Sequence, residues 1–236
     1  MKGNISFINI NKSFSGKRVL DSFNHQFELN KVHVILGKSG MGKSVLLKSL
    51  MGLIEIDDGE ILINNKNLEN IKKDDGFNIS YVFQFSALLN SLSVIENITL
   101  YLDEKNIGSK DERLIKANKI LKNLGLEDSS GKIPSDLSGG MRKRAAIARS
   151  LMIEPQILLY DEPTAELDQI NTKIISDIIL GLKNEKEITQ LVVTHDVAFA
   201  KSIADTLSIL DDGKITLTTN REGIEGLDHP LINPLK

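Results

Sequence analysis

The chain has 236 residues, of which 41% are hydrophobic and 26% charged, and its 29 Lys and Arg against 32 Asp and Glu give a formal net charge of −3. This length fits one large domain, or a core with an attached subdomain, and the composition is that of a globular protein rather than a disordered or membrane-embedded one. The slight acidity argues against broad electrostatic binding to nucleic acid. The absence of cysteine excludes disulfides, thiolate metal sites and cysteine nucleophiles.

Hydropathy indicates a chain that does not cross a membrane. No apolar run approaches the roughly 18 residues that a spanning helix needs. The first ten residues, MKGNISFINI, lack the continuous apolar segment of a secretory signal. We therefore expect a cytosolic protein.

The first 36 residues predict β structure. Apolar and polar residues alternate over 4–10 and again over 23–29, as is typical of half-buried antiparallel strands. Residues 32–36 then form a continuous apolar run that leads into a glycine-rich segment. Apolar residues at helical spacing follow from Val45 to Leu53. This order predicts a strand, a loop and a helix.

The rest of the chain alternates between short strands and helices. Apolar runs predict strands at 60–63, 79–83, 157–160, 190–193 and 207–210, and Asp212-Gly213 predicts a hairpin turn. Since several of these runs are followed by helical patterns, we expect a parallel sheet buried on both faces. Strand signals thin out between residues 92 and 152, where helices are predicted at 110–124 and 139–152. We expect an inserted helical subdomain there and a short tail from 221 to 236.

Residues 37–44, GKSGMGKS, match the pattern G-x-x-x-x-G-K-[ST] between a predicted strand and a predicted helix. In such a loop backbone N–H groups surround phosphate oxygens, and the helix N-terminus adds positive partial charge. Lys43 would reach the β and γ phosphates, and the Ser44 hydroxyl would bind Mg²⁺. The alternative, a glycine-rich turn with a surface lysine, does not explain the setting. The predicted phosphate site comprises Gly37, Lys38, Ser39, Gly40, Met41, Gly42, Lys43, Ser44 and Val45.

Two adjacent carboxylates, Asp161 and Glu162, end the predicted strand at 157–160. In an open parallel sheet, ligands lie beyond the carboxyl ends of the strands. Asp161 can hold Mg²⁺ and its waters there, and Glu162 is the candidate general base. A strand that ends in Asp-Glu is often only structural, but the phosphate loop upstream favours the functional interpretation.

Residues 137–141, LSGGM, precede a predicted helix and suit a second anion site at its N-terminus. The segment resembles the signature loop, LSGGQ, of ATP-binding cassette (ABC) ATPases. In that family the loop contacts the γ-phosphate held by the other subunit, so the resemblance implies a head-to-tail homodimer. It assigns ATP contacts to Ser138, Gly139, Gly140 and Met141. For the arginines of the helix, Arg142, Arg144 and Arg149, we expect a solvated basic face.

The resemblance extends to other positions in the order that the family has them. Gln84 looks like the glutamine that approaches Mg²⁺ and the catalytic water, and His195 looks like the histidine that touches the γ-phosphate. Phe14 looks like the aromatic residue that stacks on adenine, with packing in the core as the alternative. Asp168, in Glu166-Leu167-Asp168, belongs to the segment that resembles the D-loop, which crosses the subunit interface.

The resemblance covers residues 4–217 and implies a P-loop NTPase fold of the ABC ATPase type within the α/β class. A RecA-like parallel-sheet core would comprise residues 1–91, with the antiparallel β section, and 153–220. The α-helical signature subdomain would comprise 92–152, all within a single domain of residues 1–236. The implied cofactors are ATP and Mg²⁺. The implied activity is ATP hydrolysis coupled to transport through an integral membrane permease, on the cytoplasmic face of the cell membrane.

Within the family, residues 42–48, 83–94 and 138–144 look most like the phospholipid-transport ATPases of the Mla (maintenance of lipid asymmetry) and MCE systems. Met141 in place of the usual signature glutamine is common in that subgroup. This implies lipid transport, with an MCE-type lipid-binding protein as a further partner. The alternative is an ABC-type ATPase that serves a membrane assembly without transport, such as one for cell-division signalling.

Two features stand apart from these motifs. Glu166 and Gln169 depart from the small residue and the proline that the family has around the D-loop. The apolar segment Phe85, Ala87, Leu88 and Leu89 follows Gln84, in the neighbourhood where this family meets the coupling helices of the permease. We therefore expect a membrane partner to dock on it.

Overall fold

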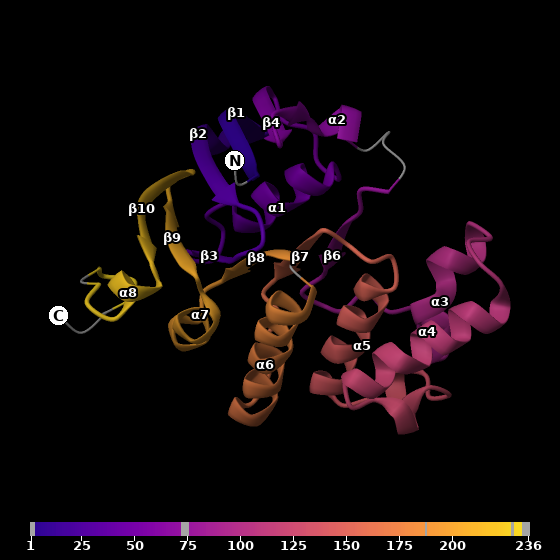
Figure 1. The fold of residues 1–236 in the computed structure, drawn as a ribbon. Helices are drawn as coiled ribbons and strands as arrows, with labels where there is room; N and C mark the ends of the chain where they lie inside the picture. The colour runs from indigo at the N-terminus through magenta and orange to yellow at the C-terminus, as the bar shows by residue number, and fades with distance from the viewer. Residues whose placement is uncertain (1–2, 72–75, 187, 228, 233–236) are drawn as a thin grey trace.

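The computed structural model describes residues 3–71, 76–186, 188–227 and 229–232. Two sheets are formed, with the strand orders β2-β1-β4-β5 and β10-β9-β3-β8-β7-β6. Their strands are β1 (Asn4–Phe14), β2 (Lys17–Glu28), β3 (Val32–Leu36), β4 (Asp58–Ile63), β5 (Lys66–Asn67), β6 (Ile79–Val82), β7 (Ile157–Asp161), β8 (Thr189–Thr194), β9 (Thr206–Asp211) and β10 (Lys214–Asn220). The helices are α1 (Lys43–Met51), α2 (Leu68–Ile71), α3 (Val94–Glu104), α4 (Lys110–Asn123), α5 (Gly139–Leu151), α6 (Gln169–Lys186), α7 (Val197–Ile203) and α8 (Arg221–Ile224). Helix α1 lies between the two sheets (Figure 1).

The first sheet confirms the antiparallel β structure predicted for the N-terminal region. β1 pairs antiparallel with β2, where Phe7 is opposite His25. The buried ring of Phe7 packs edge-on against Phe23 and Phe27, with centroids 5.6 and 5.9 Å apart. The strand predicted at 60–63 corresponds to β4, which pairs with β1 in this sheet. Aromatic and β-branched residues on its inner face thus account for the local choice of β structure.

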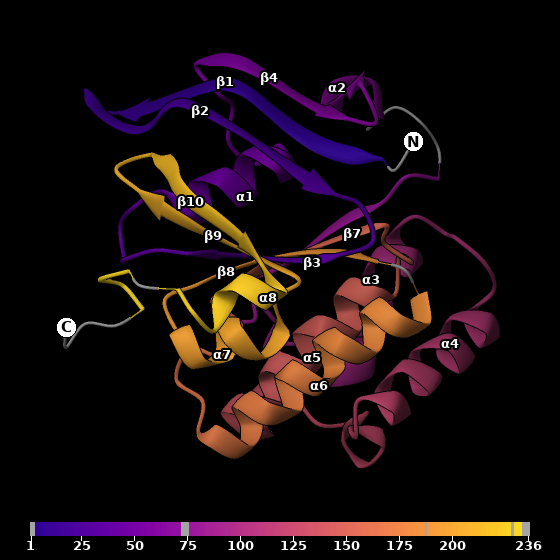
Figure 2. The ribbon, with the colours of Figure 1, turned by 60° about the vertical axis from the view of Figure 1, so that its left-hand side comes forward.

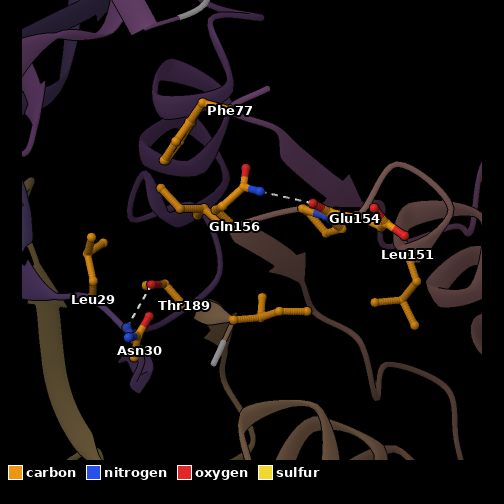
Figure 3. Close-up of a pocket in the computed structure, with 10 residues that line it drawn as sticks. Leu29, Asn30, Phe77, Leu151, Glu154, Gln156 and Thr189 are labelled. Atoms are coloured by element: carbon orange, nitrogen blue, oxygen red, sulfur yellow. Dashed lines mark hydrogen bonds between the residues drawn. The ribbon is translucent and has the colours of Figure 1, made fainter. Parts of the chain in front are cut away.

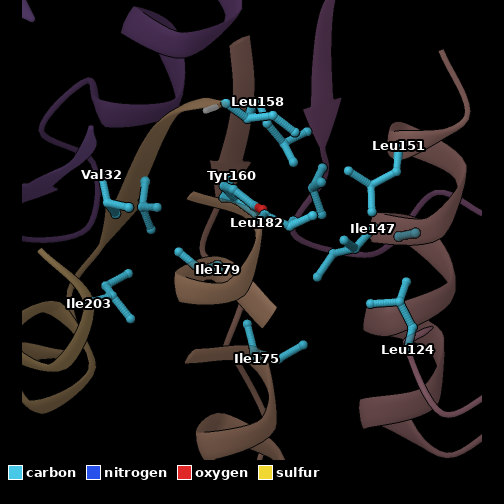
Figure 4. Close-up of a cluster of buried hydrophobic side chains, with 14 of the residues drawn as sticks. Val32, Leu124, Ile147, Leu151, Leu158, Tyr160, Ile175, Ile179, Leu182 and Ile203 are labelled. Carbon is cyan, nitrogen blue, oxygen red and sulfur yellow. The ribbon is translucent and has the colours of Figure 1, made fainter. Parts of the chain in front are cut away.

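The second sheet confirms the prediction of parallel strands buried on both faces. Every residue of β3, β7 and β8 is buried, and neighbours in the order β9-β3-β8-β7-β6 are parallel. Because successive side chains point to opposite faces, Ile35 packs with α1 and the first sheet, whereas Val34 packs with the helices on the other side. Figure 4 shows part of that second cluster, in which Tyr160 of β7 lies over Ile179 of α6.

β10 completes this sheet in the opposite direction. It pairs antiparallel with β9 through the predicted turn at Asp212-Gly213. Both turn residues have positive φ, 45° and 74°, as a type I′ hairpin requires. Beyond β10, the buried side chains of Ile224 and Ile232 join the core of the sheet.

Helices α3, α4 and α5 confirm the helical segment predicted between residues 92 and 152. Helix α3 begins at a capping box formed by Ser93 and Glu96, which satisfies backbone donors of the first turn. The apolar faces of these helices join the same buried cluster as β7, β8 and α6, and Figure 2 shows α5 and α6 side by side beneath the sheet. Among the described residues, no helix has the length and apolar character needed to cross a membrane.

Candidate nucleotide-binding and catalytic site

The carboxyl ends of β3, β6, β7 and β8 converge on one cavity of about 730 Å³. This volume lies within the range of small-molecule sites, roughly 300–1,000 Å³. The structure brings together motif residues that are up to 157 positions apart in the sequence, from Lys38 to His195. The cavity is lined by Val19, Lys38, Ser39, Gly40, Gly42, Lys43, Ser44, Val45, Gln84, Glu162 and His195.

The glycine-rich loop joins β3 to α1. Gly42 is the N-cap residue of α1 and has a φ of 90°, in the left-handed region that favours glycine. A Cβ at this position would lie 2.9 Å from Val19 Cγ1 and 3.0 Å from the Val19 carbonyl oxygen. Glycine is thus required here both by the backbone conformation and by the close approach of β2. The first-turn N–H groups of α1 open toward the cavity, as an anion site needs.

Lys43 places its charge at the centre of this loop. Its side chain is 6% exposed, and Nζ donates to the carbonyl oxygens of Gly37 at 2.7 Å and Lys38 at 3.1 Å. Nζ also lies 3.2 Å from Glu162 Oε1. A buried ammonium beside inward-facing backbone amides is the arrangement that binds a polyphosphate.

Ser44 and Asp161 form the candidate magnesium position. Ser44 Oγ donates to Asp161 Oδ1 at 2.7 Å, and the Tyr81 hydroxyl donates to Asp161 Oδ2 at 2.8 Å. Burial, together with the Asp161 charge, raises the pKa of Tyr81, so its hydroxyl remains a donor. Tyr81 is 5% exposed and was not predicted, because it is part of an apolar strand; the pairing of β6 with β7 brings it to Asp161.

Glu162 lies between a cation and an imidazole. Its Oε2 accepts a hydrogen bond from the backbone N–H of His195 at 3.2 Å and lies 2.9 Å from His195 Nδ1. Gln84 lines the same cavity. The three residues predicted to be catalytic are therefore brought to one site, with the carboxylate held on the opposite side by Lys43.

The donor set fits Mg²⁺ bound together with a nucleotide. Within the described ranges, no group of three or more His, Cys, Asp or Glu side chains could hold a metal ion. The candidate ligands are instead one hydroxyl and one carboxylate: Ser44 of the phosphate loop lines the cavity, and Asp161 lies behind it in hydrogen-bond contact with Ser44 Oγ. Mg²⁺ is commonly held in this way, by one or two protein oxygens and by the phosphates of the substrate.

The signature residues do not line this cavity. Ser138 is the N-cap of α5 and accepts a hydrogen bond from the Met141 N–H at 3.3 Å. A Cβ at Gly140 would lie 2.1 Å from Asn171 Oδ1, so the turn packs against the start of α6. The nucleotide contact of Ser138, Gly139, Gly140 and Met141 is therefore not made in the cavity of their own chain, and it stays a prediction.

The D-loop residues lie at the start of α6. Asp168 accepts hydrogen bonds from Asn171 N at 2.7 Å and Asn171 Nδ2 at 2.9 Å, and these bonds lower the pKa of Asp168. Gln169 is the first residue of α6, the helical position at which proline is also favoured. Asp168, like the signature residues, is outside the cavity lining.

Phe14 also lies outside the cavity lining. Its side chain is 43% exposed, at the end of β1, and Lys12 Nζ lies 5.2 Å from the centroid of its ring. The apolar side chains that line the cavity are those of Val19 in β2 and Val45 in α1. Packing in the core is therefore not the role of Phe14, and adenine stacking stays a prediction.

The expectation of a solvated basic face on α5 is confirmed for Arg142, which is exposed, and was wrong for Arg144 and Arg149, which are partly buried. Arg144 donates to the carbonyl oxygens of Leu124 at 2.7 Å and Gly125 at 3.0 Å. Arg149 donates to those of Ala87 at 2.6 Å and Ser86 at 3.1 Å, and Arg142 to that of Leu137. These long side chains reach across to neighbouring loops, where a guanidinium satisfies carbonyl groups that have no partner within a helix or strand.

A second cavity lies at the opposite edge of the sheet, beside the amino ends of β7 and β8 (Figure 3). Asn30 N donates to Thr189 Oγ1 at 2.8 Å and Gln156 Nε2 donates to the Glu154 carbonyl oxygen at 3.3 Å. Because ligands of such sheets bind beyond the carboxyl ends, the nucleotide site is the first cavity. The second is lined by Leu29, Asn30, Phe77, Leu151, Glu154, Pro155, Gln156, Ile157, Ile188 and Thr189.

This fold and this cavity define a P-loop nucleoside triphosphatase. The chain matches the model of the ABC transporter family over residues 20–165. It therefore belongs to that family, as an ATP-binding cassette ATPase.

Three known proteins illustrate the relationship. The chain is 37% identical to the glutamine transport ATP-binding protein GlnQ of Bacillus subtilis over 214 residues, which are 89% of this chain and 88% of that one. It is 37% identical to the protein trigalactosyldiacylglycerol 3, chloroplastic, of Arabidopsis thaliana, covering 86% of this chain but only 65% of that protein. A solved cassette, a dimer in a post-hydrolysis state bound to ADP and Pi, has a TM-score of 0.82 and 31% identity, and covers 92% of this chain and 98% of its own.

Proposed function

We propose that this chain energises transport through a membrane partner by hydrolysing Mg-ATP, with Glu162 as the general base. The proposal rests on the position of Glu162, whose carboxylate contacts both Lys43 and His195 beside the Ser44 and Asp161 pair. Phosphoryl transfer needs positioning and charge neutralisation more than covalent chemistry. The cavity supplies both.

Each residue has a defined part in this reaction. Lys43 and the loop amides bind the β and γ phosphates and offset their charge. Ser44 and Asp161 would hold Mg²⁺, which would supply positive charge to offset that of the phosphates. Glu162 takes the proton of the attacking water, and His195 orients the carboxylate through the contact at Nδ1.

The test is Glu162→Gln, which keeps the shape of the side chain and removes the base. We expect ATP to bind with affinity within about threefold of the wild type and hydrolysis to fall by about 100-fold or more. Gel filtration with Mg-ATP should show a dimer that persists. If the variant were a monomer both with and without Mg-ATP and hydrolysed ATP at an undiminished rate, the assignment of Glu162 as the base would be wrong.

A head-to-tail homodimer completes the site in this proposal. Ser138 and its neighbours lie outside the cavity of their own chain, and the solved relative bound to ADP and Pi is a dimer. The N-terminus of α5, capped by Ser138, would then face the γ-phosphate of the partner, where helix N-terminal N–H groups favour an anion. Phe14 would stack on the adenine.

A membrane permease would dock beside Gln84. An apolar groove there is lined in part by Leu53, Phe83, Ala87 and Tyr101, and Phe85 is 78% exposed. A large exposed apolar patch marks an interaction surface. Leu89 is exposed as well, whereas Leu88 packs against the core, so the docking surface comprises Phe85, Ala87 and Leu89. This partner would hold the chain at the cytoplasmic face of the membrane.

The transported molecule is proposed to be a phospholipid. The support is the resemblance in residues 42–48, 83–94 and 138–144 and a relative whose name contains a galactolipid. A glutamine-transport relative of equal identity makes a small polar cargo the competing case. ATPase activity of the chain purified with its permease should rise with phospholipid vesicles and not with glutamine, and the reverse result would reject a lipid cargo. If the chain serves a membrane assembly without transport, as in cell-division signalling, its ATPase activity would depend on neither phospholipid vesicles nor glutamine.

A further inference from the structure

Lys143 is a buried cation that the reaction described above does not use. It lies on α5, three residues after Gly140, and its side chain is 7% exposed. The ammonium donates to the main-chain oxygen of Gln84 and, at 3.3 Å, to that of Glu162. One side chain of the signature helix thus holds the backbone just beyond the ends of β6 and β7.

The surroundings compensate the burial of this charge. Burial lowers the pKa of Lys143, whereas the carboxylates of Glu166, Glu162 and Asp161 act in the opposite direction. Hydrogen bonds from an ionised donor are stronger than neutral ones, and a buried ammonium is costly without them. Both carbonyl contacts are therefore needed to keep Lys143 charged in place.

The backbone at Glu162 explains what the contact does. Glu162 has a φ of 47°, a left-handed conformation that is unfavourable for a residue with a side chain. Its N–H donates to the Val193 carbonyl oxygen at 3.0 Å. Its own carbonyl oxygen accepts from the Ala165 N–H at 3.2 Å and from Lys143 Nζ at 3.3 Å. With both peptide groups held, the direction of the Glu162 carboxylate is fixed toward the cavity.

We propose that Lys143 is a positioning residue for ATP hydrolysis, which acts through the backbone of Glu162 to aim its carboxylate at the attacking water. The inference rests on the proposed role of Glu162 as the base. Because Ser138 caps the same helix, a movement of α5 on nucleotide contact would change the placement of the base directly.

Lys143→Met removes the charge and both donors while keeping the length of the side chain. We expect the maximal hydrolysis rate to fall by about 10–100-fold, the factor for losing hydrogen bonds from a charged group. Affinity for a non-hydrolysable ATP analogue should stay within about threefold. Lys143→Arg, which keeps charge and donors, should recover part of the rate.

The control is Lys183→Met. Lys183 is another partly buried lysine, on α6, with an ion pair to Asp205 at 2.6 Å. It does not line the cavity. We expect it to lower the melting temperature and leave the hydrolysis rate within about twofold, since it serves packing alone. This separates loss of stability from loss of positioning.

Single-turnover rates in the Glu162→Gln background decide the route of action. If Lys143 works through the base, Lys143→Met should lower the residual rate there by less than about threefold. An equal loss in both backgrounds, an unchanged rate in the single variant, or a loss explained by weaker binding would each overturn the proposal. If Lys143→Met does not fold, Lys143→Gln replaces it in the same series. If the Glu162→Gln variant alone hydrolysed ATP as fast as the wild type, the proposed function would be refuted instead.

Discussion

Glu162 shows how much of the site depends on a single residue. Its carboxylate contacts Lys43 and His195, and its main chain is held by Val193 and Lys143. Its backbone has a positive φ, and its side chain lines the cavity. Unfavourable backbone conformations persist at positions where the surroundings hold the residue from several sides.

Tyr81 offers a prediction at the same scale. Tyr81→Phe removes the hydroxyl that donates to Asp161 Oδ2, so Asp161 is held on one side only. We expect the Mg²⁺ concentration for half-maximal ATP hydrolysis to rise by about 10- to 100-fold, as loss of an outer hydrogen bond weakens a metal site. ATP binding without Mg²⁺, measured by calorimetry, should be unchanged.

The matched control is Tyr160→Phe. Tyr160 is fully buried on β7, and its hydroxyl donates to Gln190 Oε1 at 2.9 Å. Tyr160→Phe therefore removes a buried hydrogen bond and leaves the contacts of Asp161 unchanged. A Mg²⁺ dependence that shifts equally in both variants would show that Tyr81 only stabilises the sheet.

These residues separate what a sequence can predict from what it cannot. Lys43 and Ser44 belong to one loop, so their spacing along the chain determines their arrangement. Tyr81 and Lys143 act on residues 80 and 59 positions away, and their roles appear only after β6 has paired with β7 and α5 has docked. Phe14 is the opposite case, since its motif is present but its ring lies outside the cavity lining.

Among the elements, the segment between β6 and α3 depends on one buried amide. Asn97 of α3 is 0% exposed, and its Nδ2 donates to the carbonyl oxygens of Leu89, Leu92 and Ser93 at 3.0, 3.1 and 3.0 Å. Its Oδ1 accepts from the Leu89 N–H at 2.7 Å. The proposed docking surface is thus tied to the helix that follows it.

Asn97→Asp tests that tie with almost no change in shape. An oxygen would replace the donor that faces three carbonyl groups, so we expect the free energy of unfolding to fall by at least about 2 kcal/mol. Asn118→Asp, on the exposed face of α4, should change it by less than about 0.5 kcal/mol. Urea denaturation measures both, and equal effects would contradict the role of Asn97.

Strands β2, β3 and β9 share a pH-sensitive contact. Burial, and then the charge of His33, lowers the pKa of His25 from 6.5 to about 4, and burial lowers that of His33. The His25 ring packs against Phe27 with centroids 4.5 Å apart, and Nε2 lies 3.2 Å from Ser208 Oγ. Between about pH 4 and pH 6.5, His25 therefore stays neutral in the folded protein, whereas the same side chain is protonated in the unfolded chain.

The stabilisation is therefore complete above pH 6.5 and is lost as the pH falls toward 4. Between pH 7 and pH 5, we expect the wild type to lose about 1–2 kcal/mol more than His25→Gln, which does not titrate. Urea denaturation at both pH values gives the comparison. The same loss in the two proteins would show that His25 is accessible to protons in the folded state.

The element order was predictable because each strand and helix is specified by local patterns, as the alternation in β1 and β2 shows. The strand with which β4 pairs was not predictable, since the sequence of β4 fits either sheet. Only the packing of Ile61 and Ile63 in the core of the first sheet decides which sheet β4 joins. The predicted boundaries between the core and the helical subdomain remain predictions.

For the whole molecule, Glu166 bears on association. It is exposed, has a φ of 66°, and stands in the loop that would face its own copy in a two-fold dimer. Two such carboxylates at about 4 Å repel by about 1 kcal/mol in water, and salt screens the repulsion. Lys143 is close enough for its pKa to be affected by this charge, so it is the candidate for offsetting it.

We expect Glu166→Gln, in the Glu162→Gln background with Mg-ATP, to strengthen dimerisation by about fivefold at low salt and less at high salt. Glu166→Gly should strengthen dimerisation to a similar extent, because it removes the same charge and its relief of the positive φ is common to monomer and dimer. Analytical ultracentrifugation at two salt concentrations measures the constants. Identical constants throughout would mean that no repulsion opposes closure.

The signature turn lies outside the cavity of its own chain, so in the proposed dimer each chain would carry half of two sites and neither half would work alone. In the proposed dimer, the active species then grows with the square of the chain concentration at high dilution. A permease that holds two copies would raise their effective concentration toward the millimolar range. The membrane partner would then act as more than the conduit: by enforcing proximity, it would decide where in the cell ATP is consumed.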